Sequence, residues 1–139
     1  MLGEPDLLLS TSTRSLGGVV IIDCYGRIVM GEETAFLRHQ VKDLLNKSRQ
    51  IVVNLADVHY IDSSGLGTLV GLHSSARRVG GEIKLASLTR RVQDVVQITK
   101  LGSIFEFYDT AEKAASTFNL PRQEPVRSVP EKGTATGTA

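Results

Sequence analysis

Aromatic side chains are scarce in this sequence: tryptophan is absent, and aromatic residues make up 5% of the 139 residues. Proteins that bind single-stranded nucleic acid stack the bases on aromatic rings, and this chain offers few of them. The formal net charge is +1, so there is no general electrostatic attraction to nucleic acid or to an acidic membrane either. We therefore expect neither a nucleic-acid nor a membrane partner.

Cysteine and long apolar runs are equally rare. Cys24 is the single cysteine, which excludes an internal disulfide bond and is typical of a reducing cytosol. No stretch approaches the roughly 20 apolar residues that a membrane-spanning helix needs. The acidic start of the chain is followed by a run of only three leucines at residues 7–9, unlike a signal peptide. These features predict a free-standing cytoplasmic domain.

The sequence does contain a regular alternation of strand-like and helix-like segments. Runs of β-branched apolar residues indicate buried strands, and apolar residues at helical spacing indicate helices packed against them. The predicted strands are 7–13, 18–24, 51–55, 82–86 and 104–108. The predicted helices are 31–45, 68–79 with its first turn at 62–64, 89–101 and 109–118.

This order, β-β-α-β-α-β-α-β-α, predicts an α/β fold with a mixed, mainly parallel sheet and helices packed on it. A single domain is expected over residues 7–118, after a flexible N-terminus at residues 1–6. Three of the four prolines fall in residues 119–139, which we expect to form a disordered tail. Three local features are also expected: a strand end at Tyr25–Arg27, Gly102 just after the third helix, and a capping box at Asp109–Glu112.

The most informative stretch lies where the central strand turns into a helix. Asp62, Ser63 and Ser64 occupy this junction, and their side-chain oxygens can accept the unpaired backbone N–H groups of a first helical turn. Gly65 and Gly67 leave the turn without bulk, so we expect another molecule to approach the backbone closely there. The junction is the candidate functional site.

Nucleophilic catalysis is one possible use of these serines, but the local pattern disfavours it. The nucleophile elbow of hydrolases requires glycine two residues before the serine, whereas Ile61 and Asp62 stand there. His59 and His73 are not placed by spacing to act as a base, and we expect His73 to be a packing residue of its helix. Metal binding is disfavoured too, because the histidines and the cysteine lie on separate elements.

Dinucleotide binding is a second alternative, since Gly65, Gly67 and Gly71 follow a strand. The Rossmann fingerprint also needs an acidic residue about 20 residues on, at the end of the next strand, to hold the ribose. That strand ends in the sequence Leu-Ala-Ser-Leu at 85–88. Asp62 would in addition repel a pyrophosphate, which leaves a small nucleotide-binding protein as the less favoured reading.

A phosphorylation switch fits the junction better. A phosphate on a serine at a helix N-terminus lies against free N–H groups and the positive end of the helix dipole. It adds about −1.5 to −2 charges, and a penalty of ~3 kcal/mol weakens binding of a partner about a hundredfold. The plainer alternative is that Asp62 and Ser63 only cap the helix, which is worth about 1 kcal/mol. Capping does not account for the whole run Ser-Ser-Gly-Leu-Gly at 63–67.

The residues Asp62–Gly67, preceded by Asn54 and Asp57, resemble the signature of the bacterial anti-sigma-factor antagonists, which are built on the STAS domain. The resemblance runs from about Leu8 to Phe118. It implies a protein without a cofactor or enzymatic activity of its own, phosphorylated on Ser63, with Ser64 as the fallback acceptor.

The resemblance also implies the partners. The unphosphorylated protein is expected to bind an anti-sigma factor, a serine kinase of the histidine-kinase-like ATPase fold, and so to free a sigma factor. A PP2C-type phosphatase resets the switch, and ATP belongs to the kinase. The expected docking residues are those of the junction, together with one arginine that we expect near this exposed loop: Asp62, Ser63, Ser64, Gly65, Leu66, Gly67 and Arg77.

One position departs from the family pattern. The family often carries Gly-Glu-Leu-Asp after its second strand, whereas this chain has Gly-Arg-Ile-Val, with Val29 in place of the acid. Glu32 or Glu33 is the candidate to replace that carboxylate. A STAS subunit of another complex, such as a stress-signalling or lipid-transport assembly, is the alternative of the same fold.

Overall fold

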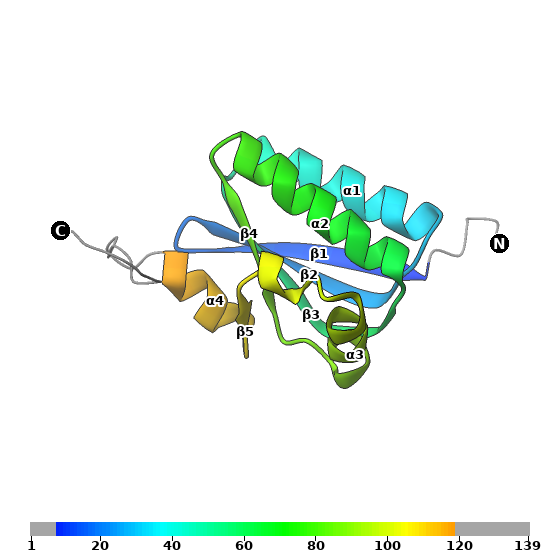
Figure 1. Ribbon diagram of the computed structural model, residues 1–139. Coiled ribbons are helices and arrows are strands. Elements are labelled where there is room, and N and C mark those ends of the chain that lie inside the picture. Colours follow the sequence, from blue (N-terminus) through cyan, green and yellow to red (C-terminus); the bar gives the residue numbers. More distant parts are fainter. Residues whose placement is uncertain (1–7, 119–139) are drawn as a thin grey trace.

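The computed structural model describes residues 8–118 of the chain (Figure 1). The flexible N-terminus and disordered tail predicted at 1–6 and 119–139 lie outside the described residues. The helices and strands are β1 (Leu9–Leu16), β2 (Val19–Ile28), α1 (Glu32–Leu45), β3 (Gln50–Ile61), α2 (Ser63–Arg78), β4 (Glu82–Ala86), α3 (Arg90–Thr99), a short 3-10 helix (Gly102–Ile104), β5 (Phe107–Tyr108) and α4 (Ala111–Phe118).

The five strands form one mixed sheet in the order β1-β2-β3-β4-β5. β1 is antiparallel to β2, and the remaining pairs are parallel. The predicted fold class and element order are therefore confirmed. The antiparallel pair follows from the tight turn at Gly17 and Gly18, which both have positive φ angles, whereas parallel neighbours need a helical crossover.

Helices cover both faces of the sheet. Side chains alternate between the two faces along a strand, and Ile22, Val53 and Leu85 point into the larger cluster, which α1, α2 and α3 complete. Ile21 and Val52 point the other way, into a smaller cluster closed by the alanines of α4. α1 and α2 lie side by side over the sheet, and α4 lies on the opposite side (Figure 1).

β2 and β3 are longer than the sequence predicts. The segment Tyr25–Arg27 does not end β2, so that prediction was wrong: the register shifts there, and the strand continues to Ile28. Gly26 has a φ of 112°, and a Cβ at this position would overlap the carbonyl oxygen of Leu8. Beyond this irregularity β2 stays paired with β3, and its last residue, Ile28, lies beside Ile61 at the end of β3.

Three predictions in the C-terminal half, for a helix end, a strand length and a helix cap, were wrong. The left-handed residue at the end of α3 is Lys100, with a φ of 61°, and Gly102 instead begins the 3-10 helix. The turn at 102–104 shortens the last strand to two residues. The hydroxyl of Thr110, rather than Asp109, accepts the backbone N–H of Lys113 at the start of α4, at 3.0 Å.

A charge cluster centred on the buried Asp23 ties the first three strands to α4, with Arg14 and Glu112 on its exposed side. The carboxylate of Asp23 accepts hydrogen bonds from the Arg14 guanidinium at 2.8 and 3.2 Å and from the Asn54 amide at 2.7 Å. Arg14 also bonds Glu112 of α4 at 3.0 Å. Burial by itself would raise the pKa of Asp23, but the bonds from Arg14 and Asn54 outweigh burial and hold that pKa below its ordinary value.

Because the folded-state pKa of Asp23 is lowered, its charge stabilises the fold above the ordinary carboxyl pKa, and this contribution is lost as the pH falls through the lowered value. We expect Asp23→Asn to lower the free energy of unfolding at pH 7 by about 1–3 kcal/mol. The deficit relative to wild type should shrink below about pH 4. Urea unfolding between pH 2.5 and 7 measures this. Asp57→Asn, at an exposed position of β3, is the control; equal deficits for both variants would contradict the assignment.

Candidate functional site

Asp62 fixes the junction between β3 and α2. It is the N-cap of α2, and one carboxylate oxygen accepts the backbone N–H of Gly65 at 2.7 Å. The other oxygen accepts the backbone N–H of Met30, in the connection between β2 and α1, at 3.0 Å. The N–H of Asp62 itself donates to the carbonyl of Ile28 at 3.3 Å. The predicted cap is confirmed, and the same side chain also joins two loops at this edge of the sheet.

The two serines differ in accessibility. Ser63 is the first residue of α2 and is exposed, whereas Ser64 is half-buried. Within the described part of the chain, the Ser63 hydroxyl makes no hydrogen bond, so it is not held by the protein. The first N–H groups of a helix have no intrahelical acceptor, so an anion on Ser63 would lie close to these donors.

Gly65 and Leu66 do not face outward, contrary to what the sequence suggested. A Cβ at Gly65 would overlap the carbonyl oxygen of Ile28 and lie 2.8 Å from the Ile61 side chain. Leu66 is 1% exposed and belongs to the core. Gly65 therefore allows α2 to pack on the end of β2, and Leu66 anchors the helix. Of the two glycines, only Gly67 is open, with nothing near its missing Cβ.

Arg77 is not close to the junction. It lies in the last turn of α2, and a helical rise of about 1.5 Å per residue places it roughly 21 Å along the axis from Ser63. The expectation that Arg77 lies near the exposed loop was therefore wrong. Its exposed side chain faces solvent at the opposite end of the helix, so a partner that docks on the junction would have to cover the whole of α2 to reach it.

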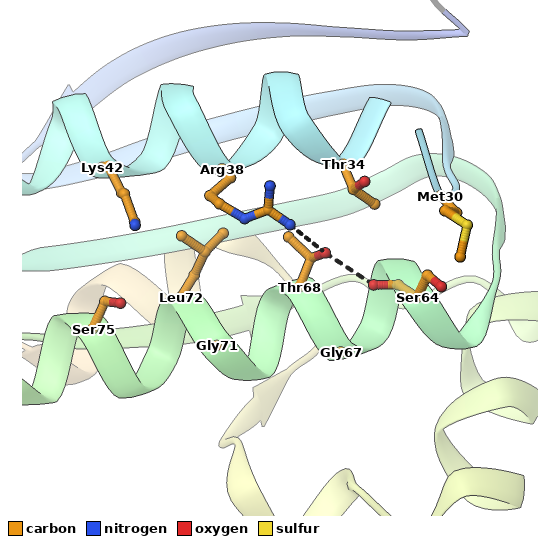
Figure 2. Close-up of a pocket in the computed structure, with 10 residues that line it drawn as sticks. All are labelled: Met30, Thr34, Arg38, Lys42, Ser64, Gly67, Thr68, Gly71, Leu72 and Ser75. Carbon is orange, nitrogen blue, oxygen red and sulfur yellow. Dashed lines mark hydrogen bonds between the residues drawn. The ribbon is translucent and has the colours of Figure 1, made fainter. Parts of the chain in front are cut away.

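A groove of about 520 Å³ runs between α1 and α2, beginning at the junction (Figure 2). Its residues come from the facing sides of the two helices and from the loop before α1: Met30, Thr34, Arg38, Lys42, Ser64, Gly67, Thr68, Gly71, Leu72 and Ser75. The Arg38 guanidinium lies 3.5 Å from the Thr68 hydroxyl, which donates to the Ser64 carbonyl at 2.9 Å. Sequence reasoning did not identify this groove.

The carboxylates that could replace the acid missing at Val29 differ in availability. Glu33 is buried, and its carboxylate accepts the backbone N–H of Leu8 at 2.9 Å. Glu32, in the first turn of α1, is exposed. Of the two candidates, only Glu32 is therefore free to meet a partner.

Two titratable residues outside the junction, His73 and Cys24, are buried in the fold. His73 is buried in α2 with its ring 5.1 Å from the ring of Phe105, and burial together with nearby Arg77 lowers its pKa. This confirms its expected packing role. Burial raises the pKa of the Cys24 thiol to about 12.

No group of three potential metal-binding side chains occurs within residues 8–118, and no helix in that range has the length and apolarity to cross a membrane.

Comparison with known proteins places the junction in context. The model of the STAS domain family matches residues 10–114. The chain is 41% identical over 73 residues to a candidate anti-sigma-factor antagonist of Thermotoga neapolitana; this match covers 52% of the chain and 65% of that protein, just under two thirds of its length. The anti-sigma-B factor antagonist of Bacillus subtilis is 34% identical over 91 residues, covering 66% of the chain and 77% of that protein.

A solved structure agrees with these sequence matches. The crystal structure of a candidate anti-sigma-factor antagonist of Thermotoga maritima superposes with a TM-score of 0.69 and 29% sequence identity. The superposition covers 79% of this chain and 95% of that one. The likeness thus includes both the sheet and the helices that hold the junction.

The contrast between the two glycines of the junction gives a direct test of the packing. Gly65→Ala should lower the free energy of unfolding by about 1–3 kcal/mol, because the added methyl group has no space. Gly67→Ala, two residues along the same helix, should raise it by about 0.5–1 kcal/mol through helix propensity. Urea denaturation of both variants is the measurement. Shifts of the same sign and size would show that Gly65 is not packed as described.

Proposed function

Because the chain belongs to the STAS-domain family, we propose that it acts as an anti-sigma-factor antagonist controlled by phosphorylation of Ser63. The observation that carries the proposal is the exposed, unbonded Ser63 hydroxyl at the start of a helix that Asp62 holds in place. Ser64 is the fallback acceptor. The exposed Ser63 and Gly67 and the half-buried Ser64 form the proposed docking surface together with Met30, which is 71% exposed.

The proposed partner is an anti-sigma factor that is also a serine kinase of the histidine-kinase-like ATPase fold. In its active complex, the γ-phosphoryl group of ATP moves to the Ser63 oxygen: an O–P bond forms at serine, the bond to the β,γ-bridging oxygen breaks, and ADP leaves. The hydroxyl proton passes to a base of the kinase. A PP2C-type phosphatase hydrolyses the phosphoserine and restores the binding form.

Two opposing effects act on a phosphate at Ser63. The free N–H groups and the helix dipole at the start of α2 favour it, while the neighbouring Asp62 carboxylate repels it. Both oxygens of Asp62 already accept backbone N–H groups, which disperses part of that carboxylate's charge. The modified chain can therefore keep its fold while its docking surface becomes strongly anionic, and this change expels a closely packed partner.

In this proposal the chain is a cytoplasmic binding module without catalytic activity. Its function is to occupy the anti-sigma factor and so release a sigma factor for transcription. The absence of an acid at Val29 supports one alternative within the same family, a STAS subunit of a different assembly. The two proposals differ in whether a kinase recognises Ser63.

Substitution of Ser63 distinguishes them. Ser63→Ala should keep the anti-sigma factor bound whether or not the kinase is active, because residue 63 can no longer be phosphorylated and stays neutral. Ser63→Asp should bind the anti-sigma factor at least tenfold more weakly than Ser63→Ala does. Pull-down from native lysate, with mass spectrometry of the retained proteins and of Ser63, is the measurement. Ser74→Asp adds the same charge at an exposed site on α2 and should not affect binding. Absence of a kinase-type ATPase among the proteins retained by Ser63→Ala would overturn the proposal.

A further inference from the structure

We propose that the groove between α1 and α2 receives an acidic segment of the anti-sigma factor. This inference rests on the proposed function and adds to it the chemistry of the contact. Its basis is a pair of cationic side chains, Arg38 and Lys42, that reach from α1 into a groove continuous with the junction (Figure 2).

The charges of the groove are unbalanced. Arg38 and Lys42 lie one helical turn apart on α1, and all ten lining residues belong to the described chain and include no carboxylate. Within residues 8–118 neither cation forms an ion pair, whereas Arg14, Lys47 and Lys84 each meet a carboxylate. Arg38 has only the long 3.5 Å contact with the Thr68 hydroxyl. Opposite charge supplied by a partner is the complement that this surface lacks.

The groove also has room for a polypeptide segment. Gly67 and Gly71 line its α2 side, and apart from the adjoining backbone of α2 itself no atom lies within 4 Å of the position that a Cβ would take at either residue. From Ser64 to Ser75 the groove runs roughly 16 Å along the helix axis. That length accommodates about three turns of a partner helix or about five residues of extended chain.

The groove lies where phosphorylation would act on it. Ser64 lines its end, and Ser63 immediately precedes Ser64 at the start of α2. A phosphate on Ser63 brings about −1.5 to −2 charges to this end, which offsets the two cations and repels an acidic segment. Release of the partner then follows from loss of electrostatic complementarity along the groove as well as from the desolvation of the phosphate itself.

The test uses the 139-residue chain and the anti-sigma factor that the Ser63→Ala variant retains in the pull-down. Each of the two proteins is cloned and purified separately. Isothermal titration calorimetry at two salt concentrations gives the dissociation constants. Arg38→Glu and Lys42→Glu should each weaken binding about tenfold or more. The matched control is Lys113→Glu, an exposed site on α4 outside the groove, which should change binding less than twofold.

A neutral pair tests the shape of the groove independently of its charge. Gly71→Leu fills the groove and should weaken binding at least tenfold, whereas Ser74→Leu, exposed on α2 but outside the groove, should not. Circular dichroism confirms that each variant is folded. For wild type, affinity should fall with added salt, and Arg38→Glu should reduce that dependence.

The outcomes separate the two proposals. If the wild-type chain binds no anti-sigma factor, the proposed function fails. If wild type binds but Arg38→Glu, Lys42→Glu and Gly71→Leu match their controls, the groove is not the contact and the function stands. If Gly71→Leu weakens binding while both charge reversals leave it unchanged, a segment binds there but is not acidic, which overturns the inference.

Discussion

The arrangement of α1 and α2 at this end of the sheet depends on two hydrogen bonds that the Asp62 carboxylate accepts. One oxygen holds the Gly65 N–H in the first turn of α2, and the other holds the Met30 N–H in the connection that leads into α1. A single side chain therefore fixes the start of one helix and the approach to the other. The exposed position of Ser63 and the open end of the groove between α1 and α2 both follow from that geometry.

The junction combines two kinds of residue within six positions. Gly65 and Leu66 face inward, where they let α2 pack on the end of β2 and join the core. Ser63 and Gly67 face outward, where a partner can reach them. A chemical switch needs this combination, because a new charge must change the surface without disturbing the packing beneath it. Residues 62–67 thus supply both the packing beneath the junction and the exposed surface of the proposed switch.

Much of this arrangement follows from local sequence signals. The alternation of β-branched runs with helical periodicity predicted the element order, and the Asp-Ser pair predicted the cap of α2, since both depend on neighbouring residues. The inward role of Gly65 depends on the carbonyl of Ile28, far away in sequence, so no local signal reveals it. The groove and the true position of Arg77 likewise depend on how α1 and α2 pack. No local signal singles out Arg38 and Lys42 either, because only the packing of α1 on α2 sets them opposite Gly67 and Gly71.

In the proposed switch, charge on Ser63 alone releases the partner, on a fold that stays intact. The most direct test compares the unphosphorylated chain with the chain stoichiometrically phosphorylated on Ser63, by titration with the purified anti-sigma factor and by amide NMR spectra of both forms. We expect phosphorylation to lower the affinity by about a hundredfold or more, with amide shifts confined to the start of α2, the Met30 loop and the adjoining groove. Equal affinities would contradict the proposed switch, and so would amide shifts that spread through the sheet, because release would then come from a change of fold.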